Sequence, residues 1–228
     1  MLINQIYNMD CLLGIQKMLE HGIQVDLIVA DPPYYIKSTK AGGHSELSRS
    51  IQPMNDQLAQ NKLTAGIDDV YLKAMWDVMK VPNIYIWCNG AQIPQYIDFV
   101  VRQRKCKMDM IIWRKTNAMP EGAKDRPSRC CEHIFLFAKS PRYYFDYHAL
   151  EQPVVAETKA RYQRNRSERS KYFASIYGQG LEKHLGQVTE ERRLVCRGKD
   201  VWDISTNAYR MGEHFAMFPE KLVEPCIL

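Results

Sequence analysis

Hydrophobic and polar positions along the chain follow two periods, one typical of short strands and one typical of amphipathic helices. Short runs bounded by turn-forming or polar residues predict strands at 3–8, 25–30, 83–88, 107–113 and 132–138. Helical spacing of apolar residues predicts helices over 11–20, 68–79 and 94–104. Residues 37–66 are polar and contain Gly42-Gly43, and we interpret them as a long loop.

This alternation of strands and helices predicts an α/β fold with a mainly parallel sheet. No helical pattern separates 107–113 from 132–138, so these two strands should pair antiparallel. The chain is expected to comprise a core half (1–145), an inserted basic and aromatic region (146–200) and a return segment (201–228). Pro219 suits the first turn of a last helix in that return segment.

Composition narrows the class of protein. With 46% hydrophobic and 25% charged residues, the 228-residue chain is typical of globular proteins and unlike disordered, fibrous or membrane-bundle sequences. No apolar run approaches the roughly 18 residues of a spanning helix, and residues 1–5 lack the layout of a signal peptide. The seven cysteines include no C-x-x-C pair, which favours idle thiols in a reducing compartment and no metal site. We therefore expect a cytoplasmic protein, prokaryotic or phage-encoded.

The net charge of +5 is concentrated in two basic segments, 102–130 and 151–200. Such segments suit a polyanionic partner such as nucleic acid, because neutralised phosphates release their counterions. A solvated charged surface explains the same pattern equally well.

The strongest chemical signal is Asp31-Pro32-Pro33-Tyr34, placed directly after the apolar run 25–30. Ligands of open parallel sheets bind at strand carboxyl ends, and the prolines make this tip a rigid loop. Asp31 and the Pro32 carbonyl can each accept one hydrogen of a planar amino group, while Tyr34, or alternatively Tyr35, can stack on the ring that bears it. The alternative is a surface turn with an incidental aspartate.

With this motif the chain resembles the DNA amino-methyltransferases, in particular the circularly permuted class with an amino-terminal Asp-Pro-Pro-Tyr. Further similarity lies in Tyr7-Asn8-Met9-Asp10-Cys11-Leu12, in the stretches ending at Trp113-Arg114-Lys115-Thr116-Asn117 and at Glu132-His133-Ile134-Phe135-Leu136-Phe137, and from Trp202 to Phe218-Pro219-Glu220-Lys221-Leu222. The resemblance implies a Rossmann-like methyltransferase sheet. It also implies methyl transfer from S-adenosylmethionine to the 6-amino group of a flipped adenine, or to the 4-amino group of cytosine.

The same resemblance assigns roles to individual residues. It implies Asp31 as acceptor and proton outlet, Pro32 as second acceptor and Tyr34 as stacking platform. Asp10, Asp31 and Lys221 would line the cofactor site. The alternative for Asp10 is a plain helix cap, and Lys221 is equally well explained as an ordinary first-turn lysine. Double-stranded DNA would be the partner. Its expected contacts are Arg161, Arg164 and Arg166 in the insertion and Arg114, Lys115 and Arg126 in the second basic segment.

One part of the family's pattern is missing, the strand and glycine-rich turn that cradle the cofactor. Gly178-Gln179-Gly180 follows no apolar strand and is not interpreted as that turn. We therefore expect an incomplete sheet and a truncated enzyme, with strand 25–30 exposed at one edge. Such an edge would accept a second copy or a complementing chain.

Two classes of function remain open on this basis. One is a methyltransferase, and the other is a non-catalytic DNA-binding or regulatory remnant of such an enzyme. An RNA or protein amine as substrate is a poorer third reading.

Overall fold

The computed structural model describes residues 4–37, 46–61, 63–118, 120, 124–140, 143–156, 195–206 and 219–228, without the side chains of 46–51 and 54. Contacts within the chain define two compact units. The first comprises Met1–Tyr144 with Asp200–Ile227, and the second comprises Phe145–Lys199 with Leu228. The first unit holds the sheet and the Asp-Pro-Pro-Tyr loop.

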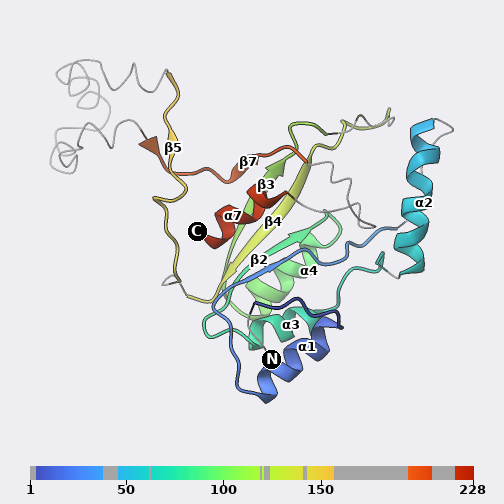
Figure 1. Ribbon diagram of the computed structural model, residues 1–228. Coiled ribbons are helices and arrows are strands. Elements are labelled where there is room, and N and C mark those ends of the chain that lie inside the picture. The colour runs from blue at the N-terminus through green and yellow to red at the C-terminus, as the bar shows by residue number, and fades with distance from the viewer. Residues whose placement is uncertain are drawn as a thin grey trace, which may run out of the picture. The chain divides into compact units, whose positions relative to one another are not determined.

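Helices and strands alternate through the first unit (Figure 1). Its helices are α1 (Cys11–Glu20), α2 (Glu46–Gln60), α3 (Asp69–Asp77), α4 (Ile93–Ile97), the π-helical continuation η1 (Asp98–Gln103) and α7 (Glu220–Ile227). Its strands are β1 (Ile28–Ala30), β2 (Asn83–Cys88), β3 (Lys107–Arg114), β4 (Cys131–Ala138) and β7 (Val201–Asp203). The second unit contributes β5 (Gln152–Pro153) and β6 (Val195–Cys196), which pair antiparallel.

The five strands of the first unit form one sheet in the order β1-β2-β4-β3-β7. β1 is parallel to β2, and β3 is parallel to β7. β4 runs antiparallel to both of its neighbours, β2 and β3, as the lack of a helix between β3 and β4 predicted. The fold is therefore α/β with a mainly parallel sheet, which confirms the predicted class.

Both faces of the sheet are buried because its central strands are apolar at nearly every position. On one face, Ile84 and Ile86 of β2 and Phe135 of β4 pack with α3, α4 and η1. On the other face, Trp87 of β2 lies with Trp113 of β3 and with Leu222 of α7. The sheet is thus the middle of three layers. The described helices pack on its two faces and not across the ends of its strands, where a site can form.

Two expected elements differ from the structure. Residues 4–9 form no strand and Ile6 is fully exposed, and none of the described strands pairs with this segment. Residues 46–60 form the helix α2 where a loop was predicted. The spacing of Leu47, Ile51, Met54 and Leu58 is helical, and Pro53 lies inside the helix.

β1 is the edge of the sheet among the described residues, since it pairs with β2 alone. The strand itself is shorter than the predicted 25–30, because Val25 makes only an isolated bridge with Met79.

Candidate active site at the end of the first strand

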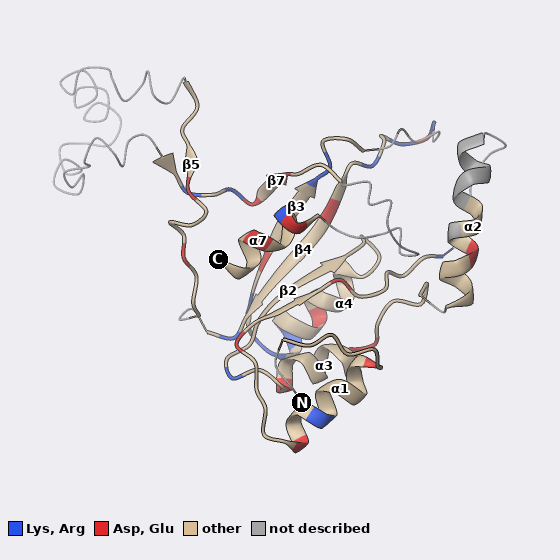
Figure 2. Ribbon diagram, in the orientation of Figure 1, with Lys and Arg blue, Asp and Glu red and all other residues tan. Residues whose placement is uncertain are grey.

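Four chain segments meet at one end of the sheet, the end at which the parallel strands terminate. We call this end the site edge. β1, β2 and β3 run parallel and end at this edge, whereas the antiparallel β4 begins there. Asp31 follows β1 directly, Lys115 follows β3 directly, and Glu132 is the second residue of β4. The edge therefore gathers charged side chains that are far apart in sequence, and Figure 2 shows basic and acidic positions next to one another where β3 ends and β4 begins.

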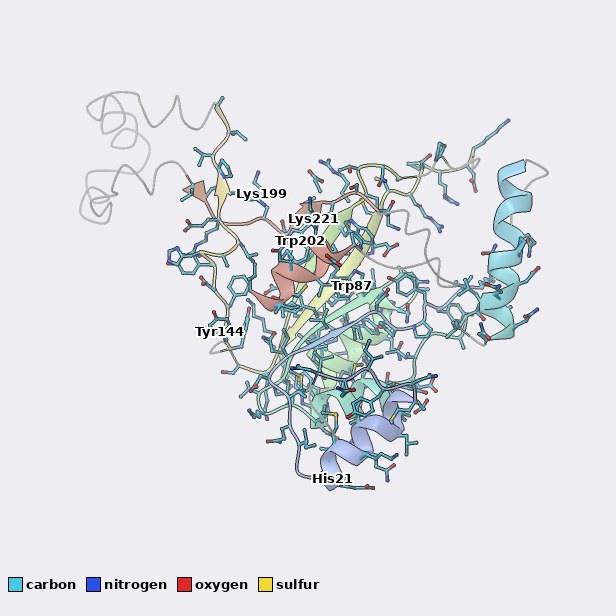
Figure 3. All side chains as sticks on the ribbon, in the orientation of Figure 1. His21, Trp87, Tyr144, Lys199, Trp202 and Lys221 are labelled. Atoms are coloured by element: carbon cyan, nitrogen blue, oxygen red, sulfur yellow. The ribbon has the colours of Figure 1, made fainter. Side chains whose placement is uncertain are left out.

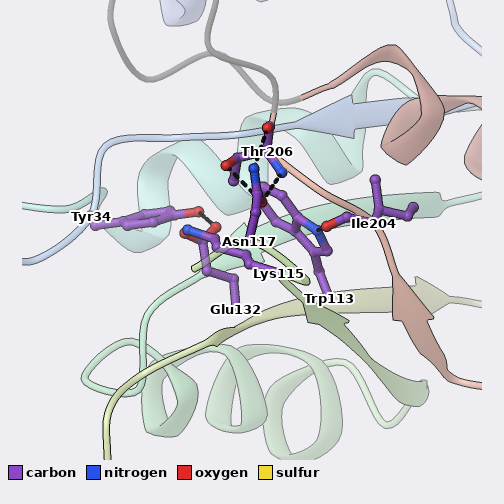
Figure 4. A network of polar contacts seen from close by, with 7 residues as sticks. All are labelled: Tyr34, Trp113, Lys115, Asn117, Glu132, Ile204 and Thr206. Atoms are coloured by element: carbon purple, nitrogen blue, oxygen red, sulfur yellow. Dashed lines mark hydrogen bonds and ion pairs between the residues drawn. The ribbon is translucent and has the colours of Figure 1, made fainter. Parts of the chain in front are cut away.

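Tyr34 is fixed by the residues of β4 and β3 (Figure 4). Its hydroxyl donates to Glu132 Oε2 at 3.2 Å, and its ring packs against the core cluster of Trp87 and Trp113. The other carboxylate oxygen of Glu132 pairs with the ammonium of Lys115. Lys115 Nζ also lies 4.8 Å from the centre of the Trp113 ring, within cation–π range. The aromatic side chain of the motif is therefore held at both its ring and its hydroxyl.

Asp31 is exposed to solvent, yet neighbouring protein atoms reduce the solvation of its carboxyl group. Its side chain is exposed, yet loss of solvation raises its pKa to about 6. A hydrogen bond with Tyr34 and the charge of Lys115 oppose this rise, while the charge of Glu132 adds to it. A carboxyl group with a pKa near neutrality exchanges protons readily at physiological pH.

The backbone of the motif loop is held from its other side by the turn after β2. Gln92 Nε2 donates to the Pro33 carbonyl at 3.4 Å, and Asn89 Nδ2 donates to the Tyr35 carbonyl at 2.5 Å. Tyr35 also forms an isolated antiparallel bridge with Ala65. Within the described residues, no hydrogen bond to the Pro32 carbonyl is present.

The return segment is fastened to β3 beside this site. Arg114 makes a two-pronged ion pair with Asp203 of β7, with both N–O distances at 2.5 Å. Trp113 Nε1 donates to the Ile204 carbonyl at 2.8 Å. Asn117 donates to the Thr206 carbonyl at 2.9 Å and accepts from the Thr206 amide at 2.7 Å (Figure 4). These contacts fasten β7, the outermost strand on the side of the sheet away from β1, to β3.

The family of the chain follows from its similarity to known proteins. Residues 25–228 match the family model described as DNA methylase. The chain belongs to this DNA methylase family.

Parts of the chain are similar to two type II methyltransferases. The type II methyltransferase M.Cfr9I of Citrobacter freundii is 33% identical over 118 residues, which are 52% of this chain and 27% of that protein. M.XycI of Xanthomonas campestris pv. cyanopsidis is 32% identical over 117 residues, 51% of this chain and 27% of that protein. The chain thus matches about a quarter of the length of these relatives. The crystal structure of the M1.HpyAVI–SAM complex shares 20% identity, with a TM-score of 0.41 over 62% of this chain and 57% of that chain.

The structure of this methylase-family chain brings some predicted site residues together and leaves others apart. Asp31, Pro32, Tyr34 and Lys115 share the site edge described above. Asp10 caps α1, where its Oδ1 accepts from the amides of Leu12 at 2.9 Å and Leu13 at 3.3 Å. The cap is therefore shown, while contact with a cofactor stays a prediction.

The remaining predicted residues have no shown contact with the loop. Lys221 is exposed in the first turn of α7 (Figure 3). Arg126 is exposed, and Arg114 is engaged with Asp203. Arg161, Arg164 and Arg166 lie outside the described residues. Their DNA contacts stay predictions.

Glu132, Asn89 and Gln92 are site residues that sequence reasoning missed. Glu132 was recognised only as the start of a strand, because its partner Tyr34 is 98 residues away. Asn89 directly follows the strand predicted at 83–88, and no role was predicted for it. A usable signal was present, since strands predicted to end or begin at the same edge place their flanking polar residues together.

Other classes of site find no support in the described part of the chain. No three His, Cys, Asp or Glu side chains are grouped there as a metal would require. All seven cysteines are free thiols. Of the helices described, none is both long and apolar enough to cross a membrane.

Proposed function

We propose that this chain methylates DNA at the exocyclic amine of a base swung out of the duplex, adenine in the first place and cytosine as the alternative. The observation that carries the proposal is the pair of acceptors at the end of β1. Asp31 is accessible with a pKa raised to about 6, and the adjacent Pro32 carbonyl is unoccupied by any described donor. Together they suit an amino group that offers two hydrogens.

The residues of the loop would act by positioning. Asp31 and the Pro32 carbonyl draw one hydrogen each, which favours a pyramidal amine nitrogen with a usable lone pair. As the nitrogen bonds to the methyl carbon, the carbon–sulfur bond of the donor would break and leave a thioether, and the amine would lose a proton that Asp31 is placed to take. Fixed reactants at near-attack distance can lower a barrier by about 7–11 kcal/mol. A rigid loop, held by Gln92 and Glu132, suits this demand.

S-adenosylmethionine is the methyl donor that we propose, because the M1.HpyAVI relative was crystallised with SAM. It supplies a methyl group activated on a sulfonium centre. Asp10 fits a role in holding it, since the carboxylate is exposed and Oδ1 alone receives the two α1 amides. Lys221, exposed on α7, is a second candidate. The partner we propose is double-stranded DNA, with Arg126, Arg161, Arg164 and Arg166 as phosphate or base contacts.

The test uses the purified chain with methyl-labelled S-adenosylmethionine and unmethylated genomic DNA, followed by analysis of the nucleosides. We expect label in N6-methyladenine, or in N4-methylcytosine if cytosine is the target. Asp31→Ala should abolish transfer and leave DNA affinity unchanged, while Asp77→Ala on α3 should retain both. Transfer that survives Asp31→Ala would contradict the assigned role. DNA binding with no retention of label by the parent chain would instead favour the non-catalytic remnant.

A further inference from the structure

Two cysteines are neighbours in the chain where β4 begins. Cys130 directly precedes β4 and Cys131 is its first residue, and their Sγ atoms lie 3.6 Å apart. Consecutive side chains of a regular strand point to opposite faces, and these two sulfurs can meet because Cys130 lies outside the strand. Cys131 is exposed, Cys130 is partly exposed, and both are free thiols. The chain therefore presents two adjoining sulfur atoms at the site edge.

A disulfide between these two thiols would be strained. The peptide bond that joins the residues is trans, which sets their Cα atoms about 3.8 Å apart. Disulfides usually join Cα atoms that are about 4.4–6.8 Å apart, and strained ones are more readily reduced. In a reducing environment the pair should therefore stay a dithiol, open to a ligand that bridges both sulfurs.

The separation of the two sulfurs suits an atom that bonds both of them in a bent arrangement. An atom about 2.3 Å from each sulfur, the length of a zinc–thiolate bond, would have an S–atom–S angle of about 103° at the 3.6 Å separation. A linear arrangement would need sulfurs about 4.6 Å apart. The described residues group no third His, Cys, Asp or Glu ligand with the pair. Trivalent arsenic meets these limits, because it is soft, its bonds are pyramidal, and one external substituent leaves two bonds for the protein.

We propose that Cys130 and Cys131 form a dithiol site for a trivalent organoarsenical. The reaction balances without an oxidant: both S–H bonds and the As=O bond of the reagent break, two As–S bonds form, and the oxygen leaves with both protons as water. Arsenic stays trivalent throughout. Partial burial and the hydrogen bond with Cys130 raise the pKa of the Cys131 thiol, so this group enters the reaction as a neutral thiol at pH 7. Because the second As–S bond forms within the chain, a bridged arsenic should be held about 10²–10⁴ times more tightly than arsenic on a single thiol.

The dithiol is connected to the proposed reaction centre. The Cys130 carbonyl accepts from the Lys115 amide at 2.7 Å. Glu132, which follows Cys131, binds the Lys115 ammonium and accepts from the Tyr34 hydroxyl. Closing a ring through both cysteines constrains the backbone at the start of β4 and so shifts these contacts. This consequence rests on the proposed function: methyl transfer should slow on the order of 100-fold, which is the cost of a displacement of about 1 Å at a reacting centre.

The test incubates the purified chain with phenylarsine oxide in excess 2-mercaptoethanol, which removes arsenic from single thiols, and measures the intact mass. We expect the parent chain to carry one phenylarsenic group in place of two hydrogens. Cys131→Ser and Cys130→Ser should each lose this adduct, because their affinity falls at least about 100-fold. Cys11→Ser removes another exposed thiol, on α1, and should keep the adduct.

Three results would overturn the proposal. The first is a parent chain that takes up no arsenic, and the second is an adduct that survives Cys131→Ser. The third is a peptide map that shows a Cys130–Cys131 disulfide in buffer with reduced glutathione, since the dithiol would then not be the resident form. If Cys130→Ser does not fold, Cys131→Ser alone decides, because Cys131 is exposed and serine is close to it in size.

Failure of this inference is distinguishable from failure of the proposed function. An adduct on a chain without methyl transfer would retain the dithiol site and reject the function. An active chain that forms no adduct would reject the site and leave the function intact. In an active chain, the arsenical should slow the parent and spare Cys131→Ser, and an equal rate of the parent with and without the adduct would overturn the connection to the reaction centre.

Discussion

At Asp31, the raised pKa that suits proton transfer also makes the ionised carboxylate unfavourable for the stability of the fold. The folded chain surrounds it closely enough to raise its pKa from 3.8 to about 6, so the carboxylate present at pH 7 is less well solvated than in the unfolded chain. The loop tolerates this unfavourable charge because Tyr34 and Lys115 offset part of it. Sites that store such strain commonly cost stability for the sake of function.

A stability measurement can detect this cost. The folded state binds more protons than the unfolded state between about pH 4 and pH 6, so the contribution of Asp31 to stability falls as the pH rises through that window. Asp31→Asn should therefore raise the midpoint of urea unfolding at pH 8 and change it little at pH 4. Asp77→Asn on α3 serves as control. A variant less stable than the parent at pH 8 would show that ionised Asp31 stabilises the fold.

Sequence reasoning at this scale succeeded where the determinant was local. Asp31 and Tyr34 were predicted as a pair because one strand and two prolines lie next to them in the chain. Glu132 and Gln92 were missed because they meet the loop only through the pairing order of β1, β2 and β4. No local pattern encodes that order.

At the scale of elements, the caps and central strands follow the sequence closely. β2 has the predicted bounds, and β3 and β4 differ from prediction by one residue at one end. Their apolar runs are buried on both faces, which leaves little freedom of register. The elements predicted wrongly are the strand at 3–8, which the described residues 4–8 do not form, and the loop at 37–66, where residues 46–60 form α2.

The cap of α1 allows the two readings of Asp10 to be separated. Asp10→Ala removes the acceptor of two helix amides and should lower the free energy of unfolding by about 1 kcal/mol. Asp10→Asn keeps a cap of similar strength but removes the negative charge. Urea unfolding should then show Asp10→Asn near the parent. If Asp10 also holds the cofactor, calorimetric titration of S-adenosylmethionine should show weaker binding to Asp10→Asn; unchanged affinity would leave the cap as its whole role.

At the scale of the whole molecule, the first unit is a sheet covered unequally on its two faces. One face carries α3, α4 and η1, with partly buried residues of α1 packed against the same core. Among the described residues, α7 is the one helix that packs on the other face, through Leu222 and Cys226. α7 comes from the far end of the chain, so β1 and the motif loop depend on a segment nearly two hundred residues away. The sequence predicted that this helix begins near Pro219, but not which face it covers.

This dependence predicts a large effect from a single side chain of α7. Leu222 is fully buried beside Trp87 and Trp113, and Leu222→Ala should lower the free energy of unfolding by about 2–5 kcal/mol, since it removes apolar contact and leaves a cavity. Ile227 on the same helix is 62% exposed, so Ile227→Ala should change stability by less than about 0.5 kcal/mol. Because the Trp113 ring contacts Lys115, the loss of Leu222 should also loosen the Lys115–Glu132–Tyr34 contacts. Urea unfolding followed by tryptophan fluorescence would measure both variants, and equal stability of the two would mean that α7 does not close this face of the sheet.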